Sequence, residues 1–161
     1  SYVRGRTVAA IIDANKKVNK ALRAGAMAVG AEVDIHDHPG YMPYTRDPSL
    51  EKVVVAACTE LVGAKEIKHR EHSTGSTDMG DYSCIMPTTS VGMAGTEGSG
   101  HSRHMKVTDP VKQYIWPAKA IAVSVIDLLS DDAKAAKKII KGFKPTIKRE
   151  EYTEFMKKLV E

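Results

Sequence analysis

The segment Ser73–His104, STGSTDMGDYSCIMPTTSVGMAGTEGSGHSRH, decides how the rest of the chain is interpreted. Glycine, serine and threonine dominate it, and glycine is favoured where a loop must come close to a ligand. Acids and histidines, which bind metals and transfer protons, lie within this background: Asp78, Asp81, Glu97, His101 and His104. This combination favours a binding or active-site loop over a surface loop that has no functional role.

Two short apolar runs interrupt the polar background of this segment. They are Cys84–Pro87, with the sequence CIMP, and Val91–Ala94, with the sequence VGMA. A flexible linker would account for the glycine and serine, but not for these runs. Short apolar runs bounded by turn residues are typical of buried strands. We therefore predict two short strands here, each followed by a loop that faces a ligand.

The composition is that of a soluble globular protein, with 42% hydrophobic and 27% charged residues among 161. No apolar run approaches the roughly 20 residues that cross a bilayer, and there is no signal-like start, so a cytoplasmic location is the default expectation. The net charge of +4 is concentrated in lysines of the last 30 or so residues, at helical spacing. That spacing favours a solvated helix face over a nucleic-acid surface. Cys58 and Cys84 form no paired motif and are expected to be buried thiols in a reducing compartment.

Capping signals predict most of the helices. Thr7 can cap a helix from Val8 to Val29, and Asp47 with Pro48 begins another that reaches Leu61. Asp109 with Pro110 begins a helix that reaches Leu129, interrupted near Trp116 and Pro117. A further helix follows Asp131 or Asp132 and runs to Ile140. A last amphipathic helix begins at Thr146, and its apolar spacing predicts four inward residues: Tyr152, Phe155, Met156 and Leu159.

Alternating or extended patterns predict strands at residues 2–6, 31–37 and 66–70. The order strand, helix, strand over residues 1–43 suggests half of a small α+β unit, which ends at the turn residues His38–Pro43. Residues 44–161 then form a second part. The chain opens without methionine, directly in a strand-like segment, which suggests an excised piece of a longer protein.

The six histidines fall into three close pairs, and each pair is a candidate metal site. His36 and His38 share one face of a strand, with Asp37 on the other face, but no third ligand is evident, so a surface pair is favoured. The same argument applies to His69 and His72. His101 differs because it lies between glycine and serine after a predicted buried strand, where the backbone can fold closely around the ring.

The ordered motifs of the chain resemble the carboxyl-terminal part of zinc-dependent amidohydrolases. The family is that of metallo-carboxypeptidases and aminoacylases, in the branch with aminobenzoyl-glutamate hydrolases. The motifs are Gly75–Ser83, Met86–Thr88 and Gly95–Ser102, together with Tyr2–Arg6 and its helix and Gly40–Pro43, which resemble the end of the family's lid domain. The resemblance spans nearly the whole chain.

The resemblance implies an α/β fold: an α+β lid portion over residues 1–43 and part of an α/β zinc-hydrolase catalytic domain over residues 44–161. It implies that His101 is a metal ligand, that Asp78 and Asp81 line the substrate site, and that Arg4 contacts a substrate carboxylate, with Arg6 as an alternative. The intact enzyme would hold two divalent ions, expected to be zinc, and would form a homodimer through the lid. Its substrate would be a small-molecule or dipeptide-like amide.

The family's other metal ligands and its general-base glutamate belong to an amino-terminal half that these residues do not contain. The implied reaction is metal-assisted hydrolysis of an N-acyl or aminoacyl amide, such as an aminobenzoyl-glutamate, with a glutamate taking the proton of metal-bound water. We expect the chain to supply one ligand and part of the pocket wall, without catalytic residues of its own and without activity alone. The alternative is a non-catalytic binding or dimerisation module that retains the fold.

Overall fold

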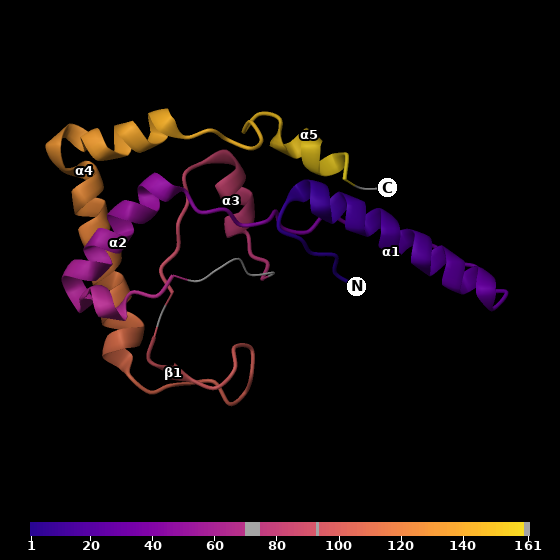
Figure 1. Ribbon diagram of the computed structural model, residues 1–161, viewed down its shortest axis with the longest axis horizontal. Helices are drawn as coiled ribbons and strands as arrows, with labels where there is room; N and C mark the ends of the chain where they lie inside the picture. Colours follow the sequence, from indigo (N-terminus) through magenta and orange to yellow (C-terminus); the bar gives the residue numbers. More distant parts are fainter. Residues whose placement is uncertain (70–74, 93, 160–161) are drawn as a thin grey trace. The chain divides into compact units, whose positions relative to one another are not determined.

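The computed structural model describes residues 1–69, 75–92 and 94–159 (Figure 1). The chain divides into two compact units. The first comprises Ser1–Thr45, Arg70–Ile85 and Pro145–Glu161, and the second comprises Arg46–His69 and Met86–Lys144. Each unit is held together by segments that are far apart in the sequence.

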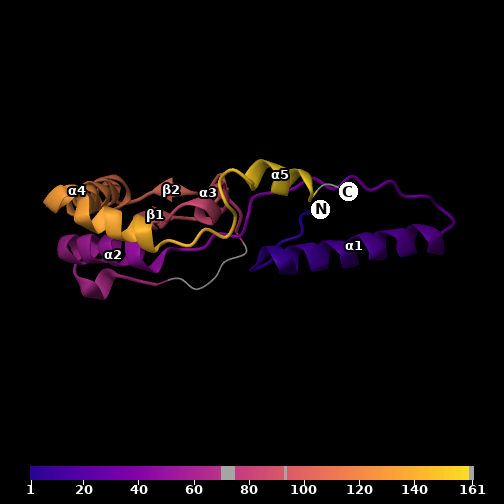
Figure 2. The same cartoon turned by 90° about the horizontal axis from the view of Figure 1, so that it is seen from above.

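The first unit contains the long helix α1 (Val8–Ala28) and the segment that follows it. The predicted cap is confirmed, because the Thr7 side chain accepts a hydrogen bond from the Ala10 amide at 3.1 Å. The chain then turns at Gly30, which has a positive φ of 69°, and residues 31–41 run back along α1 (Figure 2). The amides of Asn15 and Asn19 fix this segment by donating to the Asp37 carboxylate, each at 2.6 Å.

The core of the first unit forms where three segments meet the short helix α3 (Met79–Ile85). Met42, Cys84 and Ile147 are buried in its centre. The carbonyl of Cys84 accepts hydrogen bonds from the amides of Thr146 and Ile147, which brings the carboxyl-terminal residues onto α3. Helix α5 (Tyr152–Lys157) then covers the cluster, and the predicted inward residues of this last helix do pack against it: Tyr152, Phe155, Met156 and Leu159.

The second unit is built on two helices that lie side by side, α2 (Pro48–Val62) and α4 (Trp116–Gly142), as Figures 1 and 2 both show. Asp47 caps α2 by accepting from the amides of Ser49 and Leu50, as predicted. Small side chains occupy the crossing: Ala57, Ala120 and Ser124 are all buried, which allows the backbones to approach closely. A single 3₁₀ turn, η1 (Ala64–Glu66), follows α2 after Gly63.

Helix α4 is entered through a π-helical turn, η2 (Val111–Ile115), and it is broken near its middle. Asp109 caps η2, because its carboxylate accepts from the amides of Val111 and Lys112, both at 3.1 Å. Residues Asp131, Asp132 and Ala133 have left-handed backbone angles, so the helical segments before and after them form a kinked pair. This break agrees with the predicted start of a new helix after Asp131 or Asp132.

The predicted α/β fold class is wrong. The described residues are mostly helical, and their strands are the two short antiparallel ones β1 (Thr96–Glu97) and β2 (Lys106–Val107). A strand exists only with a neighbour that satisfies its backbone groups. Residues 2–6 and 31–37 have strand-like sequences, but no described segment pairs with them.

Three further predicted elements differ from the structure. Cys84 and Ile85 end helix α3 instead of starting a strand, because a helical turn begins at Asp78, whose carbonyl accepts from the amides of Asp81 and Tyr82, and the helix continues through them. Glu66 belongs to η1, and Val91, Gly92 and Ala94 are not in a strand; Arg70 and Met93 lie outside the described residues. The last helix begins at Tyr152, later than the predicted Thr146. Among the described helices, none combines the length and the apolar character that crossing a membrane requires.

Candidate functional site

The loop of the β1–β2 hairpin carries the histidine that the sequence singled out. Thr96 pairs with Val107 and Glu97 with Lys106, whose side chains form an ion pair at 3.3 Å. Gly98 leaves β1 with a φ of 87°, and a Cβ there would lie 2.5 Å from the His104 carbonyl oxygen. Only glycine therefore fits where the loop closes on itself.

His101 lies at the tip of this loop with a φ of 62°, a conformation that side-chain-bearing residues adopt rarely. Its side chain is exposed. The loop around it is ordered by short-range hydrogen bonds: the Ser102 amide donates to the Ser99 carbonyl, and the His104 amide donates to the Ser102 hydroxyl. The arrangement presents an exposed imidazole on a defined turn.

The described residues alone do not assemble a metal centre. A zinc site needs three or four nitrogen, oxygen or sulfur ligands, and no group of three or more histidine, cysteine, aspartate or glutamate side chains converges in the described ranges. His101 can therefore offer one ligand, and the other ligands of a centre would have to come from elsewhere. The His72 partner of His69 lies outside the described residues.

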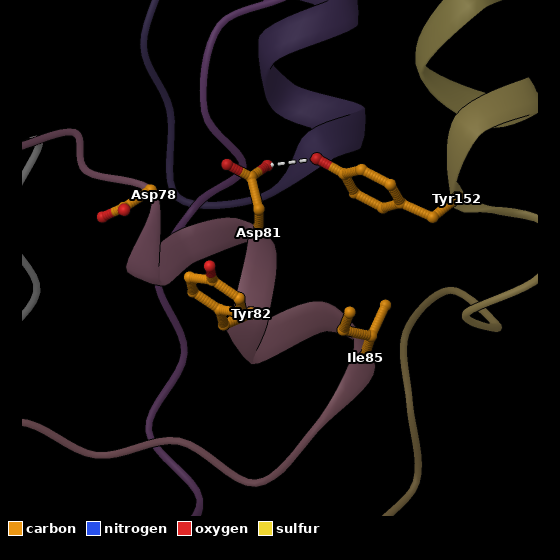
Figure 3. A pocket seen from close by; sticks show the side chains of 5 residues that line it. All are labelled: Asp78, Asp81, Tyr82, Ile85 and Tyr152. Carbon is orange, nitrogen blue, oxygen red and sulfur yellow. Dashed lines mark hydrogen bonds between the residues drawn. The ribbon is translucent and has the colours of Figure 1, made fainter.

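In the first unit, α3 and α5 border a pocket of about 270 Å³ (Figure 3). Its lining residues are Asp78, Asp81, Tyr82, Ile85 and Tyr152. The Asp78 carbonyl accepts hydrogen bonds from the amides of Asp81 and Tyr82, and this turn places both aspartates on the pocket wall. The two acids that the resemblance implies as substrate-site residues thus line the same pocket, and their role in substrate binding stays a prediction.

The carboxylates of the two aspartates accept hydrogen bonds from different partners. One carboxylate oxygen of Asp81 accepts hydrogen bonds from the Tyr152 hydroxyl at 2.7 Å and from the Met42 amide at 3.1 Å. Asp78 is exposed, and its carboxylate accepts from the neighbouring Thr77 hydroxyl at 2.9 Å. Asp81 therefore connects three segments of the unit, whereas Asp78 has the more accessible carboxylate.

Burial and the Asp81 carboxylate shift the pKa of nearby groups upwards. The pKa of Tyr152 is raised strongly, first by burial and then by its hydrogen bond to Asp81 and by the negative charge. The pKa of the Cys84 thiol is also raised by burial and by the charge of Asp81. Because a raised pKa disfavours the thiolate, Cys84 is a structural residue of the core and a poor nucleophile at neutral pH.

Arg4 and Arg6 lie in the extended segment before α1, and both are exposed. The Arg4 guanidinium carbon lies 5.5 Å from the centre of the Tyr2 ring, at the distance of a cation–π contact. Neither arginine lines the pocket of Figure 3, although they belong to the same unit. Their predicted contact with a substrate carboxylate stays a prediction.

Tyr152 and the Met42 amide are parts of this site that sequence reasoning did not predict. The apolar spacing of the last helix predicts that Tyr152 faces inward, but this spacing does not indicate a hydrogen-bond partner 71 residues away. The nearest signal is glycine: a Cβ on Gly80 would clash with the Met42 carbonyl, so this glycine marks a close approach of two segments. A single glycine in a sequence does not indicate which distant segment packs against it.

Comparison with known proteins identifies no relative: no protein-family model, no curated protein sequence and no solved structure matches the chain.

Proposed function

We propose that the chain is the carboxyl-terminal part of a metal-dependent amidohydrolase that cleaves an N-acyl or aminoacyl amide, such as an aminobenzoyl-glutamate. In this proposal the chain supplies one metal ligand, His101, and the Asp78 side of a substrate pocket. The remaining ligands and the general base come from an amino-terminal half. Alone, the chain is inactive.

The observation that carries this proposal is the conformation of His101. A left-handed backbone costs a residue other than glycine roughly 1 kcal/mol, and such conformations persist where the surroundings fix them, often at functional sites. Here the Gly98 turn and the hydrogen bonds of Ser102 fix the loop. An imidazole that is exposed and held on a defined turn is suited to complete a centre whose other ligands lie on a second polypeptide segment.

Exposed apolar residues in the second unit support the proposal that a second polypeptide segment packs against this chain. Helix α4 buries Pro117, Ala120, Ser124 and Ile139, whereas several of its larger apolar residues are exposed. These residues remain exposed, together with those of η2: Val111, Tyr114, Ile115, Ile121, Val125, Ile126 and Leu129. Among them, Ile121, Val125 and Leu129 recur every four positions and so form a stripe along α4, and an exposed apolar stripe is typical of a surface that another segment covers. In the proposal the amino-terminal half covers it.

A second candidate function is a non-catalytic binding or dimerisation module. It is favoured by the finding that, within the described ranges, three metal-binding side chains never converge. Under this alternative the hairpin loop is a surface loop, and the chain would bind no metal in any complex. The two candidates therefore differ in whether His101 matters once the other half is present.

The test is complementation. The chain is co-purified with a separately expressed amino-terminal half of a zinc amidohydrolase of the same branch. Zinc content and hydrolysis of aminobenzoyl-glutamate and of N-acyl amino acids are then measured. Replacing a residue that hydrogen-bonds to a metal ligand lowers metal affinity or activity about 10–100-fold, and replacing the ligand itself is expected to lower them more. His101→Ala should therefore lower the rate at least about 100-fold and reduce the bound zinc.

The control is His104→Ala, an exposed histidine of the same loop, which should leave zinc content and rate unchanged. Equal zinc content and rate in His101→Ala and in the unmodified chain would refute the proposed ligand. A complex that forms but neither binds zinc nor hydrolyses any of these amides would favour the binding module.

A further inference from the structure

The pocket of Figure 3 is lined by two carboxylates, two tyrosine rings and one aliphatic side chain. Asp81 and Tyr82 each follow Asp78 and precede Ile85 by three or four positions, so these four residues share one helical face. Tyr152 comes from α5, and all five residues belong to the first unit. The described residues that line the pocket therefore include two acids and no lysine, arginine or histidine.

Each of the two acids keeps one carboxylate oxygen without a donor from the described part of the chain. The Tyr152 hydroxyl and the Met42 amide donate to the same oxygen of Asp81, Oδ1, and its Oδ2 receives no hydrogen bond. Asp78 accepts from the Thr77 hydroxyl through Oδ1 at 2.9 Å, and its Oδ2 is likewise without a donor. A ligand that carries positive charge and hydrogen-bond donors would satisfy these oxygens.

The remaining walls suit the uncharged body of such a ligand. The faces of tyrosine rings attract cations, and Tyr82 and Tyr152 contribute two such rings to the walls. Ile85 adds aliphatic surface. The volume of about 270 Å³ lies just below the roughly 300–1,000 Å³ of sites for drug-sized molecules, so the ligand is a small one.

Two other classes of ligand fit these walls less well. A small carboxylate would bring a third negative charge to two acids, and like charges disfavour each other's ionised form. A divalent ion that prefers oxygen takes about six ligands. Within the described ranges, no three metal-binding side chains converge.

We propose that this pocket binds a small organic ammonium ion, which is a protonated primary amine on an aromatic or short aliphatic body. The ammonium group donates to the Oδ2 atoms of Asp81 and Asp78, and the body packs against Tyr82 and Ile85. One further step rests on the proposed function: the substrate of the hydrolase is then an aminoacyl amide with a free amino group and not an N-acyl amide.

The experiment compares three probes that share a ring and differ in charge: benzylammonium, benzyl alcohol and benzoate. Each is titrated into the isotope-labelled full chain at pH 7 and low salt, and amide shifts are followed by NMR. Benzylammonium should bind in the millimolar range that fragments of this size reach, at least about fivefold more tightly than benzyl alcohol. It should shift the amides of residues 78–85 and of Tyr152. Benzoate should not bind at up to about 20 mM.

Two variants remove a charge and keep an acceptor oxygen. Asp78→Asn should weaken benzylammonium binding about two- to fivefold, the range of an exposed ion pair, and leave benzyl alcohol binding unchanged. Asp81→Asn should weaken it as well, and circular dichroism checks that its helix content is kept. The matched control is Asp127→Asn at an exposed acid of the second unit, which should bind benzylammonium like the unmodified chain.

Three results would overturn the assignment of the pocket. The first is benzyl alcohol binding as tightly as benzylammonium, because the carboxylates would then contribute nothing. The second is unchanged benzylammonium binding in both Asp78→Asn and Asp81→Asn. The third is a set of amide shifts confined to residues outside the pocket walls.

The substrate step is tested on the complex of the chain with the amino-terminal half. Alanine para-nitroanilide and N-acetylalanine para-nitroanilide present the same scissile bond, and kcat/KM should favour the free amine at least about fivefold, a preference that Asp78→Asn should reduce. A complex that prefers the N-acetyl amide would refute the substrate step and leave the hydrolase function standing. A complex that cleaves no amide, while the chain binds benzylammonium, would refute the hydrolase function and leave the pocket assignment standing.

Discussion

At the scale of single residues, Asp81 connects more of the first unit than any pattern around it indicates. Its carboxylate accepts from the Met42 amide and from the Tyr152 hydroxyl, so it joins the segment after α1, helix α3 and helix α5. Gly80, beside it, is pressed against the Met42 carbonyl. The resemblance implied a substrate-binding role for Asp81, and that role stays a prediction next to this structural one.

Replacing Tyr152 by phenylalanine should destabilise the first unit. A hydrogen bond to a charged group contributes about 1.5–3 kcal/mol when well buried, and Tyr152 is only partly buried, so we expect a loss of about 1 kcal/mol at pH 7. The loss is measured as the difference in unfolding free energy between the two chains by urea denaturation. The control is Tyr82→Phe, which alters an exposed tyrosine of the same pocket. Equal effects of the two substitutions would contradict the role of the Asp81 contact.

The same bond makes stability depend on alkaline pH. Because the pKa of Tyr152 is raised in the folded state, the folded chain holds this proton more tightly than the unfolded chain does. The contribution is therefore fully present below about pH 10, the ordinary tyrosine value, and is lost as the pH rises above it. The difference between the unmodified chain and Tyr152→Phe should shrink above pH 10; a constant difference up to pH 11 would contradict this.

At the scale of elements, local signals placed helices α1 and α2 correctly because caps act within one turn. The Thr7 and Asp47 side chains bond amides at the helix starts they were expected to cap. The strand predictions were wrong, because a strand needs a paired segment and the local sequence does not specify which segment that is. Residues 31–37 alternate as a strand should, yet no described segment pairs with them.

The break in α4 gives a prediction at this scale. Ala133 has a φ of 55°, where the Cβ costs roughly 1 kcal/mol and glycine costs little. Ala133→Gly should therefore leave the free energy of unfolding unchanged or raise it by up to about 1 kcal/mol. The matched control is Ala136→Gly in the regular part of the same helix, which should lower it by about 1 kcal/mol. If both substitutions destabilise the chain equally, α4 is continuous in solution.

At the scale of the whole molecule, the described residues bury few large side chains. The buried hydrophobic residues are Met42, Ala57, Cys84, Ala120, Ile139 and Ile147, and no large side chain among the described residues is fully buried. Apolar residues of η2 and α4 are exposed instead. Each unit alone therefore has a small core, and covering surface by another segment or copy would stabilise it.

This exposure predicts how the α4 stripe responds to substitution. Ile121, Val125 and Leu129 are exposed by 56%, 44% and 61%, so replacing all three with serine should change the unfolding free energy by less than about 0.5 kcal/mol per site. Binding of a hydrophobic dye should fall, and assembly with the amino-terminal half should be lost. The comparison is Ala57→Leu at the buried α2–α4 crossing, where overpacking should cost about 1–3 kcal/mol. If the triple serine variant is destabilised as much as Ala57→Leu, the stripe is part of the unit's own core.

The sequence by itself determined the starts of α1 and α2, because a helix cap depends on side chains within a few positions of one another. The tertiary structure decided the rest. It turned the predicted strand at Cys84 into the end of α3, left the segment after α1 without a paired strand among the described residues, and brought the Tyr152 hydroxyl to the Asp81 carboxylate. Each of these depends on which distant segment satisfies a backbone group or a carboxylate, and that choice is made by packing and not by local pattern.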